Sequence, residues 1–159
     1  MIEEKYQPIA DMAVAMVEGI RRTGLQVVDL RERYAKVLMP MESNGNHVGI
    51  MYAGSLFTLG EFAGGIIFGV TFDITKYVPL VKEINIKFQS PAATDVTLEV
   101  SMTKEQAAEI LKEAETNGKA DFALELEIKD AKGEIVSLVN GIWQFREIPE
   151  SMKGIFATQ

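Results

Sequence analysis

Apolar residues recur every three or four positions in some stretches of the chain and every second position in others. The first helical stretch spans residues 9–20, whose apolar side chains share one face: Ile9, Met12, Ala13, Met16, Val17 and Ile20. This spacing predicts an amphipathic helix. Residues 25–30 and 33–39 follow and are rich in Val, Leu and Tyr, so they predict two strands.

The middle of the chain is apolar and rich in glycine over residues 48–72. The Asn- and Gly-containing stretch 42–47 before it predicts a loop. We expect the apolar run to form a long helix buried inside the protein, because it is apolar on nearly all sides.

Strict alternation returns in the second half of the chain and predicts four strands, at 80–89, 96–103, 122–128 and 134–146. The first of these strands places its apolar side chains on one face: Leu80, Ile84, Ile86 and Phe88. Between the second and third strands, residues 103–116 predict a helix that begins with a capping box formed by Thr103 and Gln106.

This order of elements predicts an α+β fold in which an antiparallel sheet wraps around one long central helix. We expect a single domain over residues 1–159, with residues 1–24 as an N-terminal helical extension. A second subunit would cover the remaining apolar face of the central helix, so the pattern favours a homodimer.

Composition narrows the range of functions. There are 16 basic and 23 acidic residues, and the net charge of -7 argues against a nucleic-acid-binding protein. The absence of cysteine excludes disulfides, thiolate zinc sites and a cysteine nucleophile. With one histidine, His47, a metal site is not expected, and no G-x-S-x-G motif is present. The acidic start M1-I-E-E-K does not resemble a signal peptide, so we expect a cytoplasmic protein.

Glu61 is the one acid inside the glycine-rich helical run. The run is about as long as a membrane-spanning helix, which needs roughly 20 apolar residues. A charge at its centre would be costly in lipid, and the flanking amphipathic elements need a core to pack on. We therefore expect a helix buried in protein that carries a functional acid, with no membrane association.

The segment before and along this helix carries a family resemblance. It reads N46-H-V-G49-I-M-Y52-A53-G54-S-L-F-T-L-G-E61. It resembles the signature of hotdog-fold acyl-CoA thioesterases of the phenylacetate-pathway type, Asn-x-x-Gly-x-x-His-Gly-Gly followed seven residues later by Asp or Glu. S90-P-A92 resembles the Ser-Pro-Ala that ends a strand in this family. The resemblance implies a hotdog fold and thioesterase activity.

Thioester hydrolysis needs a base or nucleophile near the carbonyl and donors for the developing oxyanion. The start of the central helix near Gly54 offers free backbone N–H groups, and a glycine permits close approach of a carbonyl. Glu61 lies seven residues further, about 10 Å along the helix, which is too far to act on the same carbonyl within one subunit. The resemblance implies that the acid comes from the opposite subunit. Burial should raise the pKa of Glu61, which suits a general base.

Other residues of the motif have expected roles near the substrate. Asn46 would orient the water or hold the carbonyl, although Asn also favours turns. Tyr52, Ala53 and Gly49 would contact the substrate. The His-Gly of the family is replaced by Tyr52-Ala53, and Val81 stands near the position at which some members carry a Ser.

Gly60 and Gly64, two further glycines of the central helix, are interpreted as positions of close packing.

Two other functions remain open. His47 and Glu61 are fourteen residues apart, which resembles the spacing of the His and Glu of hotdog β-hydroxyacyl dehydratases. The departures from the motif favour a non-catalytic module that binds acyl ligands. The expected partners are an acyl-CoA or acyl carrier thioester and a second copy of the chain. Two such homodimers could pair into a tetramer. No cofactor or metal is expected.

Overall fold

A computed structural model describes residues 1–153, which form an α+β domain. The elements in chain order are η1 (Glu4–Tyr6), α1 (Gln7–Ala15), α2 (Glu18–Thr23), β1 (Gln26–Arg31), β2 (Tyr34–Met39), α3 (Ala53–Gly69), β3 (Tyr77–Phe88), β4 (Val96–Ser101), α4 (Lys104–Asn117), β5 (Lys119–Asp130), β6 (Ile135–Glu147) and η2 (Glu150–Met152). The strands form one six-stranded antiparallel sheet in the order β1-β2-β4-β5-β6-β3.

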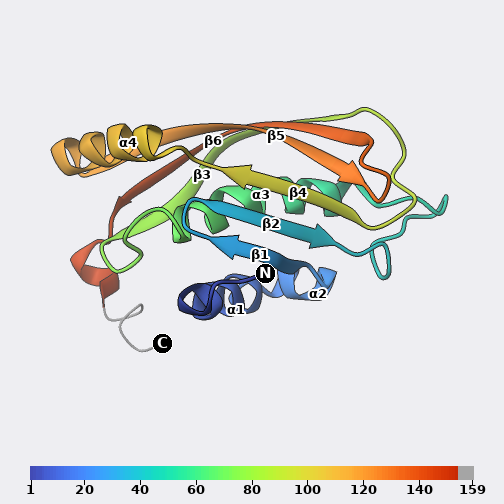
Figure 1. Cartoon of the computed structure of the whole chain (residues 1–159), viewed down its shortest axis with the longest axis horizontal. Coiled ribbons are helices and arrows are strands. Elements are labelled where there is room, and N and C mark those ends of the chain that lie inside the picture. The colour runs from blue at the N-terminus through green and yellow to red at the C-terminus, as the bar shows by residue number, and fades with distance from the viewer. Residues whose placement is uncertain (154–159) are drawn as a thin grey trace.

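The sheet arches over α3, and α1 and α2 lie below β1 (Figure 1). The predicted order of elements and the wrapping of the sheet around one central helix are confirmed. The predicted capping box of α4 is also confirmed, because the Thr103 hydroxyl accepts from the Gln106 N–H and the Gln106 side chain accepts from the Thr103 N–H. No helix within residues 1–153 is both long enough and apolar enough to cross a membrane.

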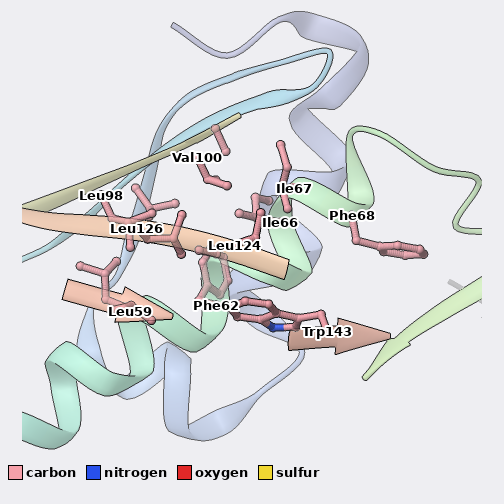
Figure 2. Close-up of a cluster of buried hydrophobic side chains, with 14 of the residues drawn as sticks. Leu59, Phe62, Ile66, Ile67, Phe68, Leu98, Val100, Leu124, Leu126 and Trp143 are labelled. Carbon is pink, nitrogen blue, oxygen red and sulfur yellow. The ribbon is translucent and has the colours of Figure 1, made fainter. Parts of the chain in front are cut away.

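The core lies between α3 and the inner face of the sheet. Figure 2 shows apolar side chains from the helix and the strands meeting there, among them Leu59, Phe62, Ile66, Leu98, Leu126 and Trp143. A Cβ atom built on Gly64 would lie 2.1 Å from two atoms of the Trp143 indole, and one on Gly60 would lie 2.9 Å from Val139. The interpretation of these two glycines as positions of close packing is confirmed.

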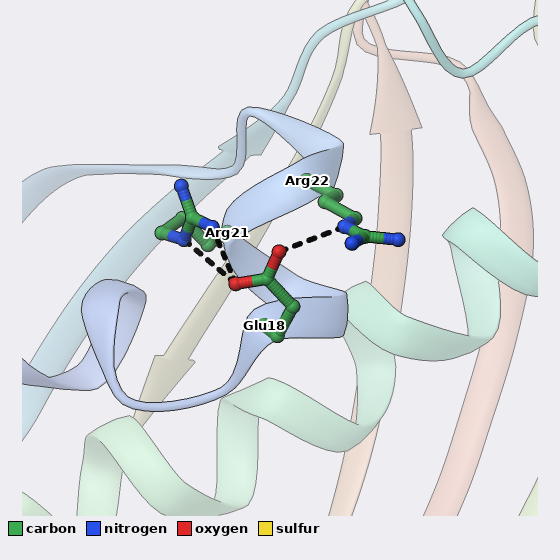
Figure 3. A network of polar contacts seen from close by, with 3 residues as sticks. All are labelled: Glu18, Arg21 and Arg22. Carbon is green, nitrogen blue, oxygen red and sulfur yellow. Dashed lines mark hydrogen bonds and ion pairs between the residues drawn. The ribbon is translucent and has the colours of Figure 1, made fainter.

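The predicted single helix over residues 9–20 is wrong in one respect, since it is two helices. Val17 separates them with an extended backbone, φ -110° and ψ 112°. The carboxylate of Glu18, at the start of α2, accepts hydrogen bonds from Arg21 and Arg22 (Figure 3). An acid in the first turn and basic residues in the last turn suit the helix dipole, so these charges favour a separate short helix at this point.

The predicted apolar row on β3 also needs a correction. A β-bulge shifts the register between Val81 and Glu83, next to Lys82. Side chains directly opposite each other in an antiparallel pair share a face. Val81 lies opposite the buried Trp143 and therefore joins the inner face, whereas Leu80 lies opposite Gln144 on the outer face.

Candidate functional site

The start of α3 presents two free backbone donors. Tyr52 is the N-cap residue with extended backbone, and its carbonyl accepts from the N–H groups of Ser55 at 3.0 Å and Leu56 at 3.2 Å. The N–H groups of Ala53 and Gly54 have no protein acceptor within residues 1–153. The predicted position of a helix N-terminus with unpaired donors therefore agrees with the structure.

The side chain of Tyr52 lies over Gly54. A Cβ atom on Gly54 would be 2.3 Å from Cε1 of the Tyr52 ring, so this ring occupies the space that a side chain would need. Tyr52 is 59% exposed. An exposed ring at a helix N-terminus can turn aside at little cost, so the space beside Gly54 is filled by a side chain that can move.

Asn46 and Gly49 shape the loop that leads into α3. The Asn46 side-chain Oδ1 accepts from the N–H groups of Val48 at 2.9 Å and Ile50 at 3.3 Å. Gly49 has φ +79°, which a residue with a side chain rarely adopts. Both residues therefore act in the turn. The predicted role of Asn46 at the reacting carbonyl and the predicted substrate contact of Gly49 stay predictions.

Asn44 is the buried polar residue of this loop, and the sequence interpretation missed it. Its amide donates to the carbonyls of Thr23 at 2.7 Å and Pro40 at 2.8 Å, and its Oδ1 accepts from the Ser55 hydroxyl at 2.8 Å. This network fixes the N-terminus of α3 to the C-terminal end of α2. The available signal was Ser55, a hydroxyl near the start of an otherwise apolar helix, because a buried hydroxyl needs a partner.

Glu61 is half-buried on α3, two turns after Gly54. Burial raises the pKa of its carboxyl, and it forms no ion pair or hydrogen bond within residues 1–153. Its burial is partial in a single chain, because Glu61 lies on the side of α3 that the sheet leaves open; its burial at a subunit interface stays a prediction. Phe57 and Gly65, four residues before and after it, are exposed on the same side.

This open side of α3 continues onto the edge strand of the sheet. β3 is the last strand, packs beside α3, and carries the exposed apolar residues Val81 and Phe88. Phe57 is 42% exposed and Val81 is 45% exposed. A single chain therefore leaves apolar residues exposed on both α3 and β3, and we call the surface that carries them the open face.

A groove of about 760 Å³ runs from Glu61 toward the C-terminal end of α3. Its walls come from four places in the chain: α1 and α2, α3, the segment that leads into β3, and residues after β6. All six apolar residues of the predicted N-terminal stripe line it: Ile9, Met12, Ala13, Met16, Val17 and Ile20. The sequence predicted this apolar stripe. It did not indicate that the stripe would line a groove, because an apolar face is as readily buried in the core.

His47 lies exposed in the loop before α3. No hydrogen bond or ion pair joins it to Glu61 within residues 1–153. The dehydratase-like pair of these residues stays a prediction. No group of three His, Asp or Glu side chains in the same part of the chain is arranged to hold a metal ion.

The profile of a domain of unknown function, DUF4442, matches residues 9–144. The chain belongs to the DUF4442 family. The match begins at the first residue of the apolar stripe of α1 and ends within β6, so it includes the loop, the open face and all of the groove lining except the residues after β6. No protein with a curated description matches the chain.

Solved structures show the same architecture. A Pseudomonas aeruginosa protein of unknown function, PA5026, described as a probable thioesterase, is 34% identical to this chain; the match covers 89% of this chain and 95% of that one, with a TM-score of 0.84. The thioesterase HI1161 from Haemophilus influenzae is 11% identical over 89% of this chain and 90% of that one, with a TM-score of 0.67. These matches show the hotdog fold.

Proposed function

We propose that this protein hydrolyses acyl thioesters, with Glu61 as general base or nucleophile and the N-terminus of α3 as the oxyanion site. The observation that carries this proposal is that Glu61 has no charged partner and lies on the helix whose N-terminus presents the free N–H groups of Ala53 and Gly54. The description of PA5026 as a probable thioesterase supports the same reaction. The resemblance of the motif to acyl-CoA thioesterases of the phenylacetate-pathway type makes an acyl-CoA, or an acyl carrier thioester, the first substrate to test.

The reaction needs the donors and the acid on the same carbonyl. Gly54 and Glu61 are about 10 Å apart along α3, so one subunit does not bring them together. In a homodimer, Glu61 of one subunit would face the N-terminus of α3 of its partner. The N–H groups would stabilise the oxyanion, and the carboxylate would accept the proton of the attacking water or attack the carbonyl itself. In either case the C–S bond breaks and the thiolate leaves with a proton. After direct attack, water would hydrolyse the anhydride formed on Glu61.

The open face supports a homodimer. Exposed apolar residues on α3 and on the edge strand β3 would be buried by a second copy, and β3 has a free edge that could pair with the same strand of the partner. Two such dimers could form a tetramer. We expect the protein to act in the cytoplasm without a cofactor.

The test is release of free thiol from a panel of acyl-CoAs by the wild type and by Glu61→Gln. The expected result is a loss of about 100-fold or more in kcat for the variant, because a base or nucleophile would be removed. Glu109→Gln, on the exposed surface of α4, is the matched control and should retain full activity. Full activity of Glu61→Gln would refute the assigned role.

A second candidate is a non-catalytic module that binds acyl ligands. The Tyr52 ring beside Gly54 favours it, since Tyr52 stands where the family motif has histidine and its ring fills the space next to the glycine at the proposed oxyanion site. Tyr52→Ala distinguishes the two functions. An active enzyme should gain or keep turnover when the ring is removed, whereas a binding module should show no turnover in either form and yet bind an acyl-CoA.

A further inference from the structure

The N-terminal helices form one wall of a groove whose other wall carries Glu61. We propose that this groove holds the acyl chain of the substrate, with the carbonyl end at Glu61 and the chain between α1, α2 and the C-terminal half of α3. This inference rests on the proposed thioester hydrolysis. It adds that the N-terminal helices select substrates by chain length and favour a long, unbranched, uncharged chain.

The lining of the groove matches such a chain. It contains one acid, Glu61, and one cation, Lys153; most of the other lining side chains are apolar. Its volume of about 760 Å³ falls in the range of small-molecule sites, about 300–1,000 Å³. Apart from Glu61 and Lys153 the lining offers few partners to a charged or strongly polar ligand, which would lose its hydration there, so the chemistry favours an alkyl chain.

The exposure of Met16 and Val17 also supports an acyl chain as the occupant of the groove. Both are more than half exposed, 51% and 52%, although they belong to the apolar stripe of the N-terminal helices. They lie at the break between α1 and α2, where the chain turns from one helix to the next. A bound alkyl chain would cover apolar surface that residues 1–153 leave exposed, at about 25 cal/mol per Å² of area removed from water. Met side chains adapt well to chains of different shape.

The groove and the candidate catalytic acid are continuous. Glu61 and Gly65 belong both to the open face of α3 and to the groove lining. Gly65 has no heavy atom within 4 Å of the position of a Cβ, so the wall beside the carboxylate is open. A chain that lies in the groove would therefore present its carbonyl end beside the carboxylate without crossing a protein side chain.

The test fills the groove with a bulky side chain. Ala13→Trp and Met16→Trp each add volume to the groove wall, and Ile135→Trp, at the start of β6 outside the groove, is the matched control. We would measure kcat/KM for acetyl-CoA, hexanoyl-CoA and palmitoyl-CoA. Both groove variants should lose at least tenfold for palmitoyl-CoA and less than twofold for acetyl-CoA, and the control should resemble the wild type.

Direct binding separates this inference from the proposed reaction. Palmitate binding, measured by calorimetry, should be at least tenfold weaker in Met16→Trp than in the wild type and unchanged in Ile135→Trp. If no thioester is hydrolysed but these binding results hold, the reaction is refuted and the groove stands. The groove assignment is overturned if Met16→Trp, folded by circular dichroism, binds palmitate as the wild type does, if all chain lengths are affected equally, or if the variant becomes monomeric with its chain-length profile unchanged. The last result would make the groove a contact between copies.

Discussion

The indole of Trp143 occupies the space next to the backbone of Gly64, and a Cβ there would lie 2.1 Å from two of its atoms. Trp143 is 1% exposed, so the ring has no room to retreat. This contact sets how closely β6 approaches the central helix. It also gives Gly64 a purely structural role, whereas the neighbouring Gly65 faces open space.

We expect Gly64→Ala to lower the free energy of unfolding by about 1–2 kcal/mol. Overpacking a core typically costs about 1–3 kcal/mol, which exceeds the gain of about 1 kcal/mol from replacing Gly in a helix. Gly65→Ala is the matched control, because no heavy atom lies within 4 Å of its Cβ position, and it should keep or gain stability. Thermal and urea unfolding of both variants would check this. Equal effects of the two substitutions would contradict the close contact.

Asn44→Ala should destabilise the fold by about 1–3 kcal/mol, because the substitution leaves buried carbonyl and hydroxyl groups without a partner. Asn46→Ala should cost less than about 1 kcal/mol, since this side chain is half-exposed and bonds only its own turn. Urea unfolding measures both. Acyl-CoA turnover by Asn46→Ala gives a second result: a stable variant with lost activity would uphold the catalytic role predicted for Asn46, and full activity would leave it a turn residue.

The stability of the wild type relative to Glu61→Gln should depend on pH. Burial raises the folded-state pKa of Glu61, so the native state holds the proton more tightly than the unfolded chain does. The stabilising contribution of the protonated carboxyl is complete below the unfolded pKa of about 4.3 and is lost as the pH rises through the folded pKa. Glu61→Gln should therefore melt at a higher temperature than the wild type at pH 8, and the difference should disappear near pH 4.

The matched variant Glu109→Gln should show no such pH-dependent difference from the wild type. If Glu61 is the base, activity should rise with pH through the same raised pKa, and the midpoint of kcat/KM against pH should lie above the ordinary value for Glu. A midpoint at or below about 4.3 would contradict this assignment.

Val81→Asp should break the proposed dimer. Val81 lies on the inner face of the edge strand beside α3, and a charge there would have to be buried when a second copy covers the open face. Sedimentation velocity should show a monomer, and turnover should fall by about 100-fold or more if the site needs both subunits. Ile142→Asp, on the outer face of β6 opposite Ala123, is the control and should remain a dimer. A dimeric Val81→Asp variant with full activity would place the interface elsewhere.

Much of the fold could be predicted from local pattern. The alternation in the four later strands, the capping box at Thr103 and the continuous apolar run of the central helix each depend on residues close in sequence, and period 2 and period 3.6 are distinct. Hence the order of elements and the sheet around α3 could be predicted from the sequence. The bulge after Val81 was not, because a one-residue shift in pairing is decided by the partner strand β6.

The sequence by itself determined that an acid, Glu61, stands on an apolar helix seven residues after a glycine at the helix start. It also determined that an apolar stripe runs along the N-terminal helices. Only the tertiary structure decided that this stripe lines a groove that reaches Glu61, that Tyr52 lies over Gly54, and that Asn44 is the buried amide. These are contacts between segments distant along the chain. The spacing of side chains along the sequence determines which face of a helix or strand a residue lies on. Tertiary packing determines which other segment that face contacts.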